Sequence, residues 1–133
     1  MGFDNQSELV NRLVQAVAAT APPQWTKIAF YFEFLQDERI GLRNKDTGRC
    51  FGGPNHDIRL DGYGLGGSMA VFKAREALFQ ESARNGDKWA GTLLVILNDG
   101  RFKCRFFYQD TPLLNNDGFA VDNIISAGLR ELP

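Results

Sequence analysis

One turn signal in the C-terminal half of the chain limits the possible folds more than any other feature. Residues 89–97 form a strand-like segment whose aliphatic run, residues 93–97, is apolar on both faces, as is typical of a strand inside a covered sheet. Asn98-Asp99-Gly100 follows directly and is a strong short-range hairpin signal. Residues 101–108 then alternate in polarity and place Cys104 on the apolar face. We therefore predict an antiparallel hairpin over residues 89–108, with Cys104 buried.

A second hairpin is predicted in the N-terminal half. Residues 25–34 place large apolar side chains on alternate positions, residues 36–38 are polar as in a turn, and residues 39–45 form a weaker strand. Three helices are expected: one from Asp4 or Ser7 to Pro22-Pro23, one over residues 68–85 and one over residues 120–129. The sequence therefore predicts a single α+β domain, residues 1–133, in which an antiparallel sheet of two or more hairpins packs against helices.

The segment from residue 48 to residue 67 differs from the rest of the chain. It holds seven of the 14 glycines, together with Pro54 and the sole histidine, His56. Glycine and proline at this density indicate a long loop that contains at most a short strand over residues 57–60. We expect Cys50, which lies in this glycine-rich segment, to be exposed.

Charge and composition argue against several functional classes. The 15 Lys and Arg residues nearly balance the 16 Asp and Glu residues, and neither half of the chain is basic, which disfavours direct nucleic-acid binding. No run approaches the roughly 18–20 apolar residues of a membrane span, and residues 1–5 lack the start of a signal peptide. Two cysteines are too few for a disulfide framework or a zinc site. We expect a soluble cytoplasmic protein without metal or cofactor.

No catalytic constellation is recognisable. His56 and Asp57 are sequence neighbours, but neighbours on a strand point to opposite faces and so do not form an acid–base dyad. The chain has neither a G-x-S-x-G nucleophile motif nor an H-E-x-x-H metal motif. The three cations within residues 101–105 fit the solvated face of a sheet, where they are expected to pair with acids such as Glu33 on a neighbouring strand. We therefore do not expect an enzyme.

One motif points to an alternative function. Residues 62–67, GYGLGG, fit the pattern G-x-G-x-x-G and precede the helix expected at Ser68, whose N-terminus would suit an anion such as a pyrophosphate. A dinucleotide fold also needs a buried strand before the motif and a parallel crossover after it, and the sequence favours neither. The alternative is a small-ligand or anion-binding protein, or an enzyme, that uses the Gly62–Gly67 loop and the following helix.

Two blocks of the sequence together resemble a known family. The first is PPQWTKI at residues 22–28, which joins the first helix to an aromatic strand carrying Tyr31 and Glu33. The second comprises NGDKW at 85–89, DGRF at 99–102 and FYQD at 107–110. These motifs resemble the YezG-like immunity family, whose members are small cytoplasmic antitoxins that neutralise polymorphic toxin domains, often nucleases. The resemblance implies a cognate toxin domain as partner and carries over no catalytic residue.

A surface that binds a toxin is expected to present aromatic anchors and charged groups. The glycine-rich segment offers such groups, and so does the first predicted hairpin. The candidate partner-binding residues are Phe51, His56, Asp57, Asp61 and Tyr63, followed by Glu33, Asp37 and Glu38. We expect the free protein to be a monomer or a homodimer, the latter through an uncovered sheet edge.

Overall fold

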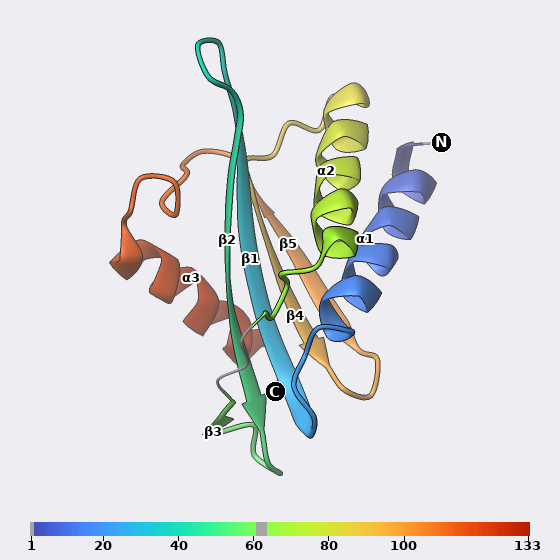
Figure 1. The fold of residues 1–133 in the computed structure, drawn as a ribbon, viewed down its shortest axis with the longest axis vertical. Helices are drawn as coiled ribbons and strands as arrows, with labels where there is room; N and C mark the ends of the chain where they lie inside the picture. The colour runs from blue at the N-terminus through green and yellow to red at the C-terminus, as the bar shows by residue number, and fades with distance from the viewer. Residues whose placement is uncertain (1, 61–63) are drawn as a thin grey trace.

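The computed structural model describes residues 2–60 and 64–133, with side chains from Asn5 onward. Three strands follow the first helix and two follow the second (Figure 1). The elements are α1 (Gly2–Ala18), β1 (Trp25–Asp37), β2 (Gly41–Gly52), β3 (Ile58–Arg59), α2 (Met69–Arg84), β4 (Gly91–Leu97), β5 (Phe102–Phe107) and α3 (Gly118–Glu131). The predicted α+β class is confirmed, and each of the three predicted helices is present.

The strands form one antiparallel sheet in the order β3-β2-β1-β4-β5. The two predicted hairpins are β1–β2 and β4–β5, and they join in the middle of the sheet, where β1 pairs with β4. Residues 98–100 form the turn between β4 and β5, as the Asn-Asp-Gly signal predicts. Because β1 is longer than β4, residues 35–37 pair only with β2, and this end of the hairpin projects beyond the sheet as a two-stranded arm (Figure 1).

Helices cover both faces of the sheet, which gives the molecule three layers (Figure 1). α1 and α2 lie on one face over an aromatic core in which the rings of Phe32 and Trp89 lie 5.7 Å apart. α3 covers the other face, where Ile125 packs in a second core with Tyr31. β4 is buried along its whole length because it contributes to both cores, as its apolar sequence predicts.

β2 reaches Gly52, well beyond its predicted end at residue 45, so the glycine-rich segment begins inside the sheet. Gly48 lies opposite Phe30 in the β1–β2 ladder, and the side chain of Leu65 lies close over it. Cys50 is buried in the core beneath α1 and α2, and the expectation that it is exposed is wrong. Pairing with the long strand β1 holds this stretch extended although its own composition does not favour a strand.

The rest of the glycine-rich segment passes the edge of the sheet on its way to α2. β3 pairs with the end of β2, which confirms the short strand expected over residues 57–60. Gly66 packs directly on the ring of Phe30 with a φ of +74°, so a β-carbon there would overlap the ring. The N–H of Gly66 donates a hydrogen bond to Thr20 Oγ1 at 2.7 Å. The segment is therefore anchored to the core just before α2 begins.

Candidate functional site

The predicted partner-binding residues do not form one surface. Asp37 and Glu38 lie at the tip of the β1–β2 arm. The Asp37 carboxylate accepts hydrogen bonds from the N–H groups of Arg39 and Ile40, so it stabilises the turn. Glu38 is exposed beside it.

The candidates from the glycine-rich segment lie at the opposite end of the sheet. Phe51 is on β2, and His56 and Asp57 are in the turn that leads to β3. Asp57 is exposed, whereas Phe51 and His56 line a common hollow. Asp61 and Tyr63 lie outside the described residues.

Glu33 is completely buried, and the prediction that it contacts a partner is wrong. Its Oε2 accepts hydrogen bonds from the Tyr31 hydroxyl and from the N–H of Leu113, the latter at 2.9 Å. Its Oε1 accepts one from the N–H of Leu114 at 2.8 Å. Burial and the neighbouring carboxylate raise the pKa of Tyr31, so the hydroxyl keeps its proton and remains the donor. Glu33 thus fixes the segment that precedes α3.

Because Glu33 is buried, the cations within residues 101–105 pair with other acids. Glu33 shares a face of β1 with Tyr31, and that face is covered by α3 and the preceding segment. Arg101 pairs with Asp99 in its own turn, and Arg105 pairs with Glu131 of α3. The expected pairing of these cations with Glu33 is therefore wrong.

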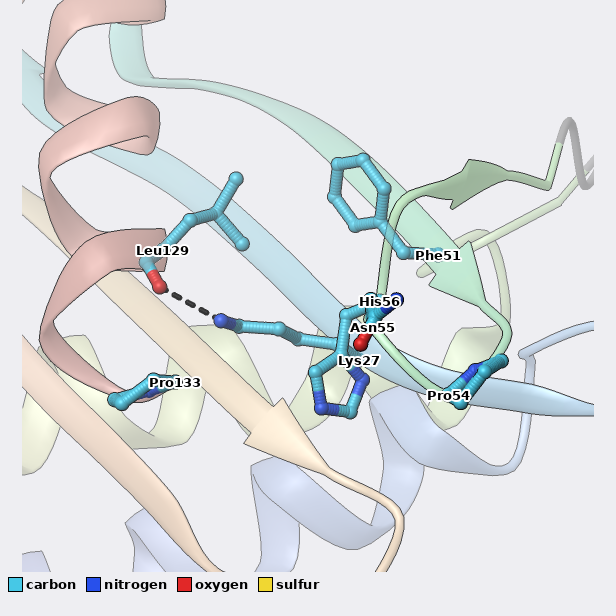
Figure 2. Close-up of a pocket in the computed structure, with 7 residues that line it drawn as sticks. All are labelled: Lys27, Phe51, Pro54, Asn55, His56, Leu129 and Pro133. Carbon is cyan, nitrogen blue, oxygen red and sulfur yellow. Dashed lines mark hydrogen bonds between the residues drawn. The ribbon is translucent and has the colours of Figure 1, made fainter.

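One hollow, the Lys27 pocket, lies between the C-terminal end of α3 and the β2–β3 turn (Figure 2). It has a volume of about 500 Å³ and is lined by Lys27, Phe51, Pro54, Asn55, His56, Leu129 and Pro133. Lys27 is only 5 % exposed, and its ammonium donates a hydrogen bond of 2.6 Å to the Leu129 carbonyl, drawn dashed in Figure 2. Burial lowers the pKa of this ammonium. The pocket combines two predicted residues with a buried cation that the sequence analysis missed.

His56 is held in place at two points. Its backbone is left-handed, with a φ of +54°, which is uncommon for any residue other than glycine. Its N–H donates to the Gly53 carbonyl at 3.2 Å, and its ring Nδ1 lies 2.8 Å from Thr26 Oγ1. Nε2 is therefore the ring nitrogen that a ligand in the pocket can reach.

A smaller hollow of about 430 Å³ adjoins the Lys27 pocket and shares Phe51 and Leu129 with it. In the ladder, Phe51 lies opposite both Lys27 and Arg59, so these three residues form a row across β1, β2 and β3. The Arg59 guanidinium lies over the Phe51 ring, 5.9 Å from its centroid. Arg49, two residues before Phe51, also lines this hollow. Asp122 lines the same hollow and forms an ion pair with Arg49 at 2.9 Å, so Arg59 and Lys27 are the cations of this corner that form no described ion pair.

A further hollow, the Tyr108 cleft, lies between the end of β5 and the start of α3 and has a volume of about 710 Å³. Its lining residues are Tyr31, Phe106, Phe107, Tyr108, Gln109, Asp110, Pro112, Asn115, Asp117, Ala120, Asn123 and Ile124. Aromatic rings, carboxylates and side-chain amides predominate in this set, which contains no lysine or arginine. The cleft therefore has the opposite charge character to the Lys27 pocket.

Hydrogen bonds fix the walls of the Tyr108 cleft. Glu33 holds the backbone of Leu113 and Leu114, so it positions the segment that supplies one wall. Asp117 caps α3 by accepting a hydrogen bond from the N–H of Ala120 at 3.1 Å. The Tyr108 hydroxyl donates to Asp87 at 2.8 Å. None of the Tyr108 cleft residues is among the binding residues predicted from the sequence, although FYQD at 107–110 is part of the family resemblance.

Neither described cysteine is activated as a nucleophile. Burial raises the pKa of the Cys50 thiol and raises that of Cys104 to about 12, so both stay protonated at neutral pH. The His56 ring contacts the Thr26 hydroxyl, and no described carboxylate forms a hydrogen bond with the ring to complete a nucleophile–base–acid triad. Among the residues that the structure describes, no group of three His, Cys, Asp or Glu side chains could hold a metal ion.

The Gly62–Gly67 loop is only partly described, since Gly62 falls outside the described residues. The N–H of Gly66 is bound by Thr20, and the N–H of Gly67 donates to the Gly64 carbonyl at 2.8 Å. At the start of α2, the N–H of Val71 donates to the side chain of Ser68. These donors are thus engaged within the chain, and the strand before the loop, β3, is an antiparallel edge strand. The described part of the loop does not favour a phosphate site.

Neither a known protein family nor a curated protein matches the chain. None of the described helices is long and apolar enough to span a bilayer. The chemistry of the Lys27 pocket and of the Tyr108 cleft, together with the family that the sequence motifs resemble, therefore indicates what the chain binds.

Proposed function

We propose that the chain is an immunity protein that binds and neutralises one cognate toxin domain in the cytoplasm, with the Tyr108 cleft as its contact surface. The observation that carries this proposal is the combination of carboxylates and aromatic rings in a cleft whose lining contains no cation. Such a cleft is electrostatically complementary to a basic partner. The resemblance of the sequence motifs to the YezG-like immunity family supports the same function.

The rim of the Tyr108 cleft offers the kind of side chains that anchor protein complexes. Tyr108 is 56 % exposed, and Phe119, in the first turn of α3 beside the lining residue Ala120, is 80 % exposed. Aromatic side chains are enriched in interfaces because they bury a large area at a low cost in conformational entropy. An arginine of the partner could stack on Tyr108 while Asp110 accepts its guanidinium hydrogen bonds.

A nuclease toxin is the partner class that this chemistry suits best. A nuclease domain uses lysine and arginine side chains to bind the phosphates of its substrate. An inhibitor that offers Asp110 and Asp117 to those cations occupies the surface that the nucleic acid needs. We therefore propose inhibition by competition with the nucleic acid.

The fixed walls of the cleft favour tight binding. A surface whose segments are already ordered loses less conformational entropy when a partner binds. Glu33 orders the 113–114 backbone from inside the molecule, and Asp117 fixes the start of α3. These internal hydrogen bonds therefore hold the walls of the proposed interface in place before a partner binds.

The proposal is tested by measuring binding to the toxin domains encoded beside this chain and survival of cells that express them. Wild-type protein should bind one such domain and protect the cells. Asp110→Lys should weaken binding by at least about tenfold, because it places a cation against a basic surface. Asp57→Lys, the same charge reversal on an exposed residue of the β2–β3 turn, is the matched control and should bind normally.

Two outcomes would contradict the proposal in different ways. If Asp57→Lys weakens binding while Asp110→Lys does not, the toxin contacts the glycine-rich segment and the Tyr108 cleft is the wrong surface. If folded wild-type protein neither binds nor protects against any of these domains, the immunity function itself is wrong.

A further inference from the structure

Lys27 is a buried cation without a buried counter-charge. Its ammonium has three N–H groups, and its one described hydrogen bond is to a neutral acceptor, the Leu129 carbonyl. No described aspartate or glutamate forms an ion pair with Lys27, and none lines the Lys27 pocket. Buried charges in proteins are usually paired with an opposite charge, and no described aspartate or glutamate provides one for the Lys27 ammonium.

The end of α3 compensates part of this charge. Leu129 lies in the last turn of α3, where the helix dipole and the terminal carbonyls favour a cation. The Leu129 carbonyl takes up one N–H of the ammonium, and two remain for the cavity that Lys27 lines (Figure 2). The helix end therefore positions the ammonium while leaving donors available to a ligand.

His56 supplies a second polar group to the same cavity. Thr26 orients the ring through Nδ1, and the left-handed turn at His56 holds the side chain against the Lys27 pocket (Figure 2). A non-glycine residue in this conformation persists where its surroundings hold it, and such positions are common at binding sites. Two potential hydrogen-bond donors thus line one cavity from separate segments of the chain.

The walls of the pocket strengthen an electrostatic interaction inside it. Phe51, Leu129 and two prolines supply apolar surface, which lowers the local polarizability and raises the strength of a charge pair. Arg59, in the adjoining hollow, adds to the positive potential, whereas Asp122 offsets the charge of Arg49 there. The volume of about 500 Å³ leaves room for an organic group attached to the anion.

We propose that the Lys27 pocket binds a small ligand through an anionic oxygen group, a phosphate or a carboxylate, which accepts hydrogen bonds from the Lys27 ammonium and the His56 imidazole. This site is separate from the proposed toxin-binding surface. The C-terminal end of α3 lines the Lys27 pocket, whereas the N-terminal half of α3 lines the Tyr108 cleft. The anion site can therefore be tested independently of the immunity function.

The experiment titrates the full chain with inorganic phosphate, phenyl phosphate or benzoate at constant ionic strength in chloride. His56 is the sole histidine, so its imidazole resonances in NMR spectra report on the pocket without ambiguity. We expect a saturable shift of these resonances and a rise in melting temperature at saturating ligand. Stronger binding of phenyl phosphate indicates a phosphate ligand, and stronger binding of benzoate indicates a carboxylate ligand.

Four variants, two of them controls, identify the groups responsible. Lys27→Met removes the charge while keeping most of the side-chain volume, and should weaken binding at least tenfold. His56→Asn keeps a residue that tolerates positive φ and should weaken binding less. Lys73→Met, at an exposed position on α2, is the matched control and should bind as wild type. Asp110→Lys should also leave anion binding unchanged, which separates this site from the toxin surface.

The proposal is overturned if none of the three probes produces a saturable shift of the His56 resonances. It is also overturned if folded Lys27→Met binds with the affinity of the wild type. If Lys27→Met does not fold, as judged by circular dichroism, His56→Asn is tested in its place. The proposal is then overturned if His56→Asn binds every probe with the affinity of the wild type.

Discussion

The hydroxyl of Tyr31 donates a hydrogen bond of 2.5 Å to the carboxylate of Glu33, two residues further along the same face of β1. The same carboxylate accepts the N–H groups of Leu113 and Leu114, which are some 80 residues away in the sequence. One buried side chain therefore connects the central strand of the sheet to the wall of the Tyr108 cleft.

Replacing Glu33 by glutamine should destabilise the fold. The amide presents N–H groups where the native side chain accepts hydrogen bonds, and so it leaves a buried donor facing another donor. We expect Glu33→Gln to lower the free energy of unfolding by about 2–3 kcal/mol, and Tyr31→Phe to lower it by about 1 kcal/mol. Urea denaturation measures both, and equal stability of Glu33→Gln and wild type would contradict the assigned hydrogen bonds.

Alkaline pH should destabilise the protein, in part through Cys104. Burial raises the pKa of this thiol to about 12 from an ordinary value of 9.0, so the folded state holds the proton more tightly than the unfolded chain. Its contribution is fully present below pH 9 and is lost as the pH rises toward 12, with a slope of at most about 1.4 kcal/mol per pH unit. The lowered pKa of Lys27 acts in the opposite sense below its ordinary value of 10.5.

Comparison with Cys104→Ala separates the two effects. This variant keeps Lys27 but lacks the titrating thiol, so its stability should fall less steeply than that of wild type between pH 9 and pH 11. Urea midpoints at pH 7, 9 and 10.5 give the two slopes. Parallel curves would show that Cys104 does not titrate with folding.

Arg75 should matter for its packing more than for its ion pair. Its guanidinium lies 5.6 Å from the Phe32 ring centroid and 5.5 Å from that of Phe34, and it pairs with Asp46 at 2.9 Å. Burial raises the pKa of Asp46 more than the charge of Arg75 lowers it, so the pair gives little net stabilisation. We expect Arg75→Ala to cost about 3 kcal/mol and Asp46→Asn less, about 1–2 kcal/mol, because Asn44 and the rings of Phe32 and Phe34 still contact the guanidinium. Similar losses in the two variants, measured by urea unfolding, would contradict this ranking.

Gly66 should tolerate no side chain, because the Phe30 ring occupies the space of a β-carbon. Gly64 is the matched control, since its φ is also positive and a β-carbon there meets no atom within 4 Å. We expect Gly64→Ala to cost about 1 kcal/mol from backbone strain. Gly66→Ala should cost about 1–3 kcal/mol more because of the overlap. Equal thermal or urea stability of the two alanine variants would show that the loop does not pack on Phe30.

Local signals in the sequence are sufficient for most elements of the fold. The turn at residues 98–100, the helix stop at Gly86 and the alternation within residues 25–34 all depend on neighbours a few positions apart. β2 is the exception. Its glycines give no local preference for a strand, and its extension to Gly52 depends on pairing with β1, which local patterns do not reveal.

The burial of Glu33 is partly present in the sequence. β4 is apolar on both faces, which already indicates that helices cover the sheet on both sides. Any strand beside β4 must then bury the side chains on both of its faces. In β1, these side chains include Tyr31 and Glu33. The missing information is the strand order, which places β1 next to β4 and is a property of the tertiary structure.

The Lys27 pocket and the Tyr108 cleft are still harder to predict from local sequence, because tertiary structure brings their residues together. Lys27, Phe51, His56 and Leu129 come from four separate segments, and polarity alone assigns Lys27 to solvent. Lys27 is buried because α3 lies across the sheet and its C-terminal end contacts the lysine side chain. Two of these four residues were predictable as exposed or loop groups, whereas the cation between them was not.

The central place of β1 has a consequence for the order of folding. β1 meets β2 across a short turn, where Asp37 pairs with Gly41, but it meets β4 only through pairs such as Glu33 with Gly91. Distant pairings form more slowly because a longer loop must close first. We therefore expect the β1–β2 hairpin to appear early. During synthesis, the aromatic face of this hairpin lacks its β4 neighbour until the ribosome has passed residue 97, and the nascent chain is most prone to aggregate in that interval.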